Sequence, residues 1–191
     1  MADFSSSYLL RQLFYRYEPE GTELFAVLDG ARSTEIYRNL QLSTLEYESL
    51  FSGRLSDKLR AASPFVVRLL PDDPFMDFLI EQGWGKSFGI FLSWKGGLTS
   101  LRRHLRTLLR VRAESGRYLF FRFYDPRVLR QFLPTCSAEQ LGLVLGKIRR
   151  VDLEAADGGE LWRFRTSSDT PPQLLRWQHT LQDATRSVQR D

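Results

Sequence analysis

The segment Leu24-Phe25-Ala26-Val27-Leu28-Asp29-Gly30 decides the fold class of this chain. A continuous apolar run that closes in an Asp-Gly turn is typical of a strand buried on both faces of a sheet. The runs at 65–70 and 88–94 have the same character and are also bounded by proline or glycine. The sequence therefore predicts a sheet whose central strands contact no water on either face.

Helical segments alternate with these runs. Cap residues and apolar positions one turn apart predict helices, and apolar or alternating runs predict further strands. We expect helices over 5–17, 33–40, 75–81, 98–109, 127–133 and 138–145, a weaker element at 47–51, and strands over 118–124, 148–153 and 161–165. This alternation indicates an α/β fold with a mostly parallel or mixed sheet and flanking helices, in one domain or two small lobes.

The carboxy-terminal segment carries apolar residues in alternating steps of three and four, which is the spacing of a helix seam. These residues are Leu174, Trp177, Leu181, Ala184 and Val188. The pattern predicts a C-terminal helix that docks on the rest of the protein, with Trp177 a candidate for contact with a partner. We divide the chain into an α/β domain at 1–150 and a terminal part at 151–191, packed on the same domain.

Composition favours a protein of the cytoplasm. The chain has 191 residues and a single cysteine, Cys136, which excludes an internal disulfide. Asp3 stands where a signal peptide would carry a positive charge, and no apolar run approaches the roughly 18 to 20 residues that span a bilayer. We expect no membrane insertion.

Positive charge gathers on one predicted helix. The leucines from Leu98 to Leu109 form its inward face, and its outward face carries arginines. The outward residues are Arg102, Arg103, Arg106 and Arg110. Such a face fits three interpretations, namely a solvated surface, contact with an acidic protein, or contact with nucleic acid, although no known nucleic-acid motif accompanies it.

Catalytic and metal-binding patterns are weak. His104 and His179 lie in no recognisable motif, and one cysteine with two distant histidines cannot form a zinc site. Asp29 and Asp125 each follow a predicted strand, where a carboxylate could act as a base, but turn and cap formation explains them more simply. The glycines at 83–85 do not complete a phosphate-binding loop. We predict no cofactor, no metal and no enzymatic activity.

Several motifs together resemble one known family. They are the segments 25–31 (Phe-Ala-Val-Leu-Asp-Gly-Ala), 63–67, 98–111, 119–129, 132–134 and 139–141, and the most specific is Arg122-Phe123-Tyr124-Asp125-Pro126-Arg127. They are similar to the type VI secretion effector adaptors, also called Tap or TEC chaperones, over roughly residues 24–150. Ser93-Trp94 stands where that family often has a Glu-Ser pair.

The resemblance implies a binding protein. Such adaptors hold a toxic effector in the cytosol and help to mount it on the VgrG spike, so the implied partners are an effector and VgrG. The candidate partner-binding residues are the four outward arginines, Trp177, and the corner residues Arg122, Tyr124, Asp125 and Arg127. For the corner residues we favour a structural role, in which a helix cap and buried ion pairs fix a strand-to-helix corner. The alternatives are a nucleic-acid-binding domain and, third, a small hydrolase that uses Asp29 or Asp125.

Overall fold

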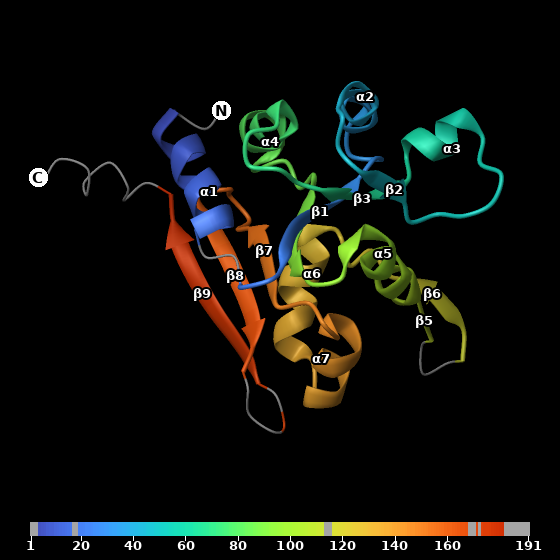
Figure 1. Ribbon diagram of the computed structural model, residues 1–191. Coiled ribbons are helices and arrows are strands. Elements are labelled where there is room, and N and C mark those ends of the chain that lie inside the picture. The colour runs from blue at the N-terminus through green and yellow to red at the C-terminus, as the bar shows by residue number, and fades with distance from the viewer. Residues whose placement is uncertain (1–3, 17–18, 113–115, 168–170, 172, 182–191) are drawn as a thin grey trace, which may run out of the picture.

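The computed structural model describes residues 4–16, 19–112, 116–167, 171 and 173–181 (Figure 1). Helices and strands alternate along most of the chain. In order they are α1 (Phe4–Arg16), β1 (Glu23–Asp29), α2 (Thr34–Leu42), β2 (Tyr47–Ser49), α3 (Asp57–Ala61), β3 (Pro64–Arg68), α4 (Pro74–Phe78), the π-helix η1 (Leu79–Gly83), β4 (Gly89–Trp94), α5 (Gly97–Leu108), β5 (Arg110–Arg112), β6 (Tyr118–Phe120), α6 (Pro126–Phe132), the 3-10 helix η2 (Leu133–Thr135), α7 (Ala138–Leu145), β7 (Arg150–Glu154), β8 (Glu160–Thr166) and β9 (Leu174–Thr180).

The main sheet has seven strands in the order β2-β3-β1-β4-β7-β8-β9, and every neighbouring pair is antiparallel. The α/β class is confirmed, but the prediction of a mostly parallel or mixed sheet is wrong. Alternation shows that helices separate the strands, and it does not show which strands become neighbours. The connection from β1 to β3 contains α2, β2 and α3, and it returns the chain in the opposite direction.

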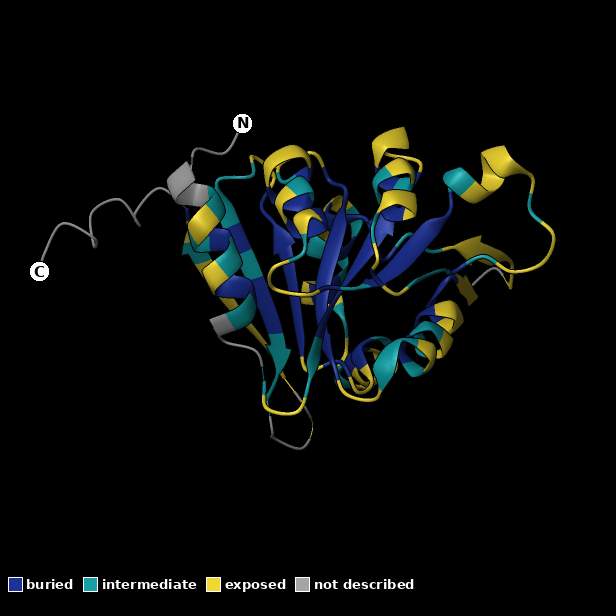
Figure 2. Cartoon of the chain, turned by 45° about the horizontal axis from the view of Figure 1, so that its top comes forward, coloured by how far each residue is buried: buried dark blue, intermediate teal, exposed yellow. Residues whose placement is uncertain are grey.

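Helices cover both faces of this sheet. Phe25 and Val27 of β1 point to the side of α5, α6 and α7, whereas Leu24, Ala26 and Leu28 point to the side of α1, α2 and α4. Figure 2 shows the central strands buried between helices whose outer sides are exposed. The buried strand predicted at 24–28 is therefore confirmed, because each face of β1 packs on its own hydrophobic core.

The predicted strand over 118–124 is largely wrong. Only Tyr118–Phe120 is a strand, and it pairs with β5 in a separate two-stranded ribbon outside the main sheet. Phe123 and Tyr124 are buried, but they reach the core from the turn that precedes α6. An apolar run does not reveal whether its side chains are buried from a strand or from a turn.

The C-terminal helix is also a wrong prediction as far as residue 181. Leu174–Thr180 forms β9, which pairs with the whole of β8 and places Trp177 opposite Arg163. Ala184 and Val188 lie outside the described residues. Seven residues are too few to separate the two periodicities, and the free edge of β8 offers a full ladder of hydrogen bonds.

The predicted leucine face is confirmed. Leu101, Leu105 and Leu108 of α5 are buried, and the helix begins beside Gly96-Gly97 as expected. The helix ends at Leu108, however, so Arg110 lies in β5 and not on the helix. Within the described ranges, no helix combines the length and the apolar character that a membrane crossing requires.

Candidate functional site

Asp29 ends β1 and begins the first half of the site. Its side chain is buried, and one carboxylate oxygen accepts a hydrogen bond from the backbone N–H of Ala31 at 3.2 Å. The following turn approaches another segment closely, because a Cβ on Gly30 would lie 2.4 Å from the carbonyl oxygen of Ala61 and 2.5 Å from that of Ser63. Only glycine fits there, so the turn holds the Asp29 carboxylate in a fixed position.

Asp125 supplies the second half as the N-cap of α6. Its carboxylate accepts from the backbone N–H of Arg127 at 3.0 Å, and Pro126 occupies the first turn. The same carboxylate receives a bidentate contact from the Arg127 guanidinium, with Nε at 2.9 Å and Nη2 at 2.6 Å. The predicted cap and ion pair at this corner are therefore present.

Arg122 joins the two halves. Its guanidinium donates to the Asp29 carboxylate and lies 3.7 Å from a carboxylate oxygen of Asp125. Asp29 and Arg122 are 93 residues apart in the chain, so the fold alone brings these two motifs together. Both carboxylates are buried while the side chains of Arg122 and Arg127 remain 43% and 48% exposed, so the site has buried acids and an outer rim of arginine.

Charge and burial set the ionisation of this corner. Burial opposes ionisation of Asp125, but the hydrogen bonds and charge of Arg127, with the charge of Arg122, hold the pKa of that carboxyl below its usual value. Burial, and then the charge of Asp29, raises the pKa of Tyr124 to about 12. At neutral pH Asp125 is therefore ionised, Arg122 and Arg127 carry positive charge, and the phenol of Tyr124 is neutral.

An open hollow of about 680 Å³ lies beside the corner. Its lining comprises Arg122, Asp125, Arg127, Val128, Gln131 and Phe132. The guanidinium groups at its rim could accept an acidic group of a partner, although both already bind internal carboxylates. The main role of these charged groups is therefore to hold the corner together. What remains for a partner is at most a small charged contact surface.

Replacing Asp125 by asparagine is expected to weaken the dependence of the free energy of unfolding on pH in acid. Asparagine keeps the helix cap and removes the charge. Because the folded pKa of Asp125 is lowered, its contribution is present above the usual value of 3.8 and is lost as the pH falls through the lowered value. We expect about 1 kcal/mol or less, since Arg127 is half-exposed. Urea unfolding between about pH 5 and pH 2 measures it, and parallel profiles for both proteins would contradict it.

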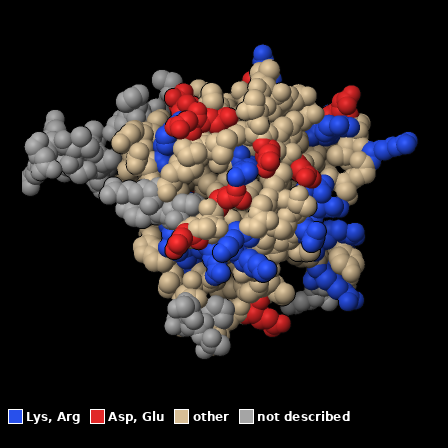
Figure 3. Space-filling view, in the orientation of Figure 1, with Lys and Arg blue, Asp and Glu red and all other residues tan. Residues whose placement is uncertain are grey.

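The outward arginines do not join this corner. Arg102 is half-buried and binds Glu48 at 2.9 Å and the carbonyl oxygen of Ser49 at 2.8 Å. Arg103 is exposed, Arg106 donates to the Ser52 hydroxyl at 2.8 Å, and Arg110 lies over the Tyr118 ring. Figure 3 shows basic side chains gathered on the side of the molecule where α5 and the β5–β6 ribbon lie. The predicted partner-binding arginines of α5 and β5 therefore lie on a different surface from the predicted corner residues.

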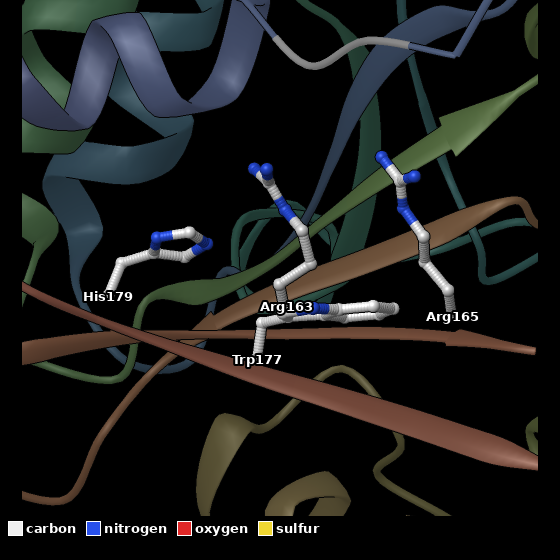
Figure 4. A pocket seen from close by; sticks show the side chains of 4 residues that line it. All are labelled: Arg163, Arg165, Trp177 and His179. Atoms are coloured by element: carbon white, nitrogen blue, oxygen red, sulfur yellow. The ribbon is translucent and has the colours of Figure 1, made fainter.

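Trp177 lies at the far edge of the sheet, on β9. It lines a cavity of about 350 Å³ together with Arg163, Arg165 and His179 (Figure 4). Burial, with the charge of Arg163, lowers the pKa of His179, so its imidazole is neutral at pH 7. The cavity is therefore lined by two guanidinium groups, an indole and a neutral imidazole.

Sequence reasoning missed a buried ionic network beside this cavity. Arg150, Asp152 and Arg163 are almost completely buried, and Arg163 contacts Asp152 with two hydrogen bonds of 2.7 Å. The alternation of charged and apolar residues over 150–154 would normally indicate a strand with one wet face. Here α1 covers that face, so the charged residues are buried and paired, and the alternation by itself did not distinguish this case from a wet face.

His104 and the loop at 83–87 both have structural contacts. His104 stacks on Trp94 and has its Nε2 3.0 Å from the carbonyl oxygen of Val144, so its ring has structural contacts. The loop at 83–87 does bind an anion, but an internal one, because the N–H groups of Gly85 and Ser87 each donate to Glu154 at 2.7 Å. Nucleotide binding was not expected there, and Glu154 already occupies these donors.

The fold and the corner define a class of protein, a three-layer α/β module whose first strand is tied to a helix cap by paired charges. A family model described as a domain of unknown function (DUF4123) matches residues 24–143, and the chain belongs to that family. The match includes both Asp29 and the corner from Arg122 to Arg127. No curated protein and no solved structure matches the chain.

Proposed function

We propose that this protein is an adaptor that binds a cognate type VI secretion effector and promotes its loading onto the VgrG spike. The observation that carries the proposal is the family match over 24–143, since this family is associated with effector-loading adaptors. The motifs behind the resemblance, at 25–31 and 122–127, lie within the matched segment. In this proposal the protein acts in the cytoplasm and performs no turnover.

The contacts of the candidate chemical groups support a binding role. Asp29 and Asp125 are both engaged by guanidinium groups, and the lowered pKa of Asp125 makes its carboxylate a weak base. Cys136 is half-buried, and burial raises the pKa of its thiol, which disfavours the reactive thiolate. The hydrolase alternative would need one of these groups to be free for a substrate.

Co-purification from the producing cell tests this function. The tagged full-length protein should retain a secreted toxin, with or without a VgrG-like protein, at moderate salt, and mass spectrometry should identify both. Deletion of the gene should abolish secretion of that toxin and leave its synthesis unchanged. Absence of any toxin from the purified protein, together with normal toxin secretion after deletion, would overturn the proposal.

Nucleic-acid binding is the second candidate, and the exposed arginines of α5 and β5 favour it. Phosphate contacts by several arginines predict a steep loss of affinity as salt rises. A gel shift with DNA and RNA at low salt measures this directly. Absence of a shift at low salt would exclude the second candidate and leave the adaptor proposal unaffected.

A further inference from the structure

The β5–β6 ribbon leaves large apolar side chains in solvent. Every residue of its two strands is exposed, and the fractions reach 64% for Tyr118, 50% for Leu119, 52% for Phe120 and 39% for Val111. A two-stranded ribbon of this length gains little stability by itself. Contiguous exposed apolar residues on a folded protein indicate an interaction surface.

The register of the ribbon connects this surface to the core. Val111 lies opposite Leu119, and alternation along the strands places Leu109 and Phe121 on the same face at the base of the ribbon. Leu109 and Phe121 belong to the core beneath α5 and α6. One apolar stripe therefore begins in the core and continues along the ribbon into solvent.

The opposite face of the ribbon is anchored to the body of the protein. Phe120 contacts Phe51 edge to face, with ring centroids 5.8 Å apart, and the Arg110 guanidinium lies 5.0 Å from the centroid of the Tyr118 ring. The Phe120–Phe51 contact joins this face of the ribbon to the segment that follows β2, and the Arg110–Tyr118 contact links the two strands of the ribbon to each other. Val111 and Leu119 therefore lie on the exposed face of a ribbon whose other face contacts the body of the protein.

Among the described residues, the charged side chains of α5 and of the two ribbon strands are all arginines, and Arg110 and Arg112 lie on the ribbon face opposite Val111 and Leu119. Arg103, Arg106, Arg110 and Arg112 are exposed, and among the described residues none of them forms an ion pair with a carboxylate. Arg102, by contrast, is paired with Glu48. Arginine and aromatic residues around an apolar centre are the composition of protein interfaces, and unpaired arginines favour an acidic partner.

We propose that the β5–β6 ribbon, with Arg103 and Arg106 of α5, is the docking surface for a protein segment in which apolar side chains are flanked by aspartate or glutamate. The inference rests on the adaptor function and assigns the segment to the client. Nucleic acid would satisfy the arginines but would leave Val111 and Leu119 without apolar contacts. The complementary partner is therefore an acidic protein segment.

A photo-cross-linker in place of Leu119 tests the site in the producing cell. The benzoylphenylalanine side chain there should cross-link the client that co-purifies with the unmodified protein, at a peptide with apolar residues beside acidic ones. The same group at Leu42, which is 76% exposed on α2, should give no such cross-link. Cross-linking from Leu42 and none from Leu119 would overturn the inference.

Paired substitutions provide the quantitative test. The double variant Val111→Ser with Leu119→Ser, and the charge reversal Arg103→Glu with Arg106→Glu, should each weaken client capture about tenfold or more. The matched controls on α2, Leu42→Ser and Arg38→Glu, should capture the client as the unmodified protein does. Unfolding curves show that each variant is folded, since exposed substitutions change stability by about 0.5 kcal/mol or less.

The outcomes separate the two proposals. Normal capture by both ribbon variants overturns the docking surface and leaves the adaptor function intact. Failure of the unmodified protein to capture any toxin overturns both. Loss of capture with the charge reversal alone, together with binding of RNA or DNA by the unmodified protein, assigns the surface to nucleic acid and overturns the docking of a protein segment.

Discussion

Replacing Asp152 by alanine is expected to lower the free energy of unfolding by about 3 to 5 kcal/mol. Asp152 is fully buried on β7 and is the carboxylate partner of two buried arginines. Its oxygens contact Arg163 at 2.7 Å and the Nε of Arg150 at 3.1 Å. Removal of this carboxylate therefore takes from the core a negative charge that two buried guanidinium groups contact.

The same arginines hold helix α1 against the sheet. Arg150 donates to the carbonyl oxygen of Phe14 at 2.7 Å, and Arg163 donates to that of Leu13 at 2.6 Å. These carbonyls belong to the last turn of α1, where the helix dipole favours positive charge. We expect the Asp152→Ala variant to show faster amide exchange throughout α1.

Urea unfolding measures the effect of Asp152→Ala, and Asp72→Ala is the matched control. Asp72 is exposed on the turn before α4, so its removal should change stability by about 0.5 kcal/mol or less. A similar small loss for Asp152→Ala would show that the buried arginines need no counter-ion. That result would contradict the role of the network in anchoring α1.

Replacing Glu154 by leucine is expected to cost about 2 to 4 kcal/mol. Glu154 is buried at the end of β7, and it accepts from the N–H groups of Gly85 and Ser87. Ser87 has a positive φ of 57°, which is uncommon for a residue with a side chain. Leucine would remove the acceptor for both N–H groups and release the loop that holds this conformation.

Two milder variants separate the effect of the Glu154 charge from the effect of the positive φ at Ser87. Burial raises the pKa of Glu154, against the hydrogen bonds from Gly85 and Ser87, so the folded state binds the proton more tightly than the unfolded chain does. Stability should therefore fall as the pH rises from the usual value of 4.5 toward the raised value, and Glu154→Gln should remove this slope. Ser87→Gly should change stability little, because glycine accepts the positive φ without strain but loses the hydrogen bond from the Ser87 hydroxyl to Glu154.

Unfolding curves at several pH values measure these effects, and Glu20→Leu is the control for the leucine variant. Glu20 is exposed, so its replacement should have little effect. Equal losses for Glu154→Leu and Glu20→Leu would show that water replaces the carboxylate at the loop. The loop would then not depend on Glu154.

Much of the candidate corner was predictable because its parts are local. Asp125 caps a helix two residues ahead of Arg127, and both the cap and the pair follow from the order Asp-Pro-Arg. The contribution of Asp29 was not predictable as part of the same site. It depends on the approach of two segments 93 residues apart, which no local pattern encodes.

By itself the sequence determined the α/β class, the buried strand β1 and the leucine face of α5, because burial on one or two faces leaves a period in the chain. Tertiary structure alone decided the antiparallel order, the strand β9 and the buried network around Asp152. Strand direction and pairing depend on which edges meet, and a charged residue has the same local pattern whether solvent or an opposite charge surrounds it. For the same reason the exposed stripe of the β5–β6 ribbon resembled core in the sequence, and only the fold shows that this chain leaves it uncovered.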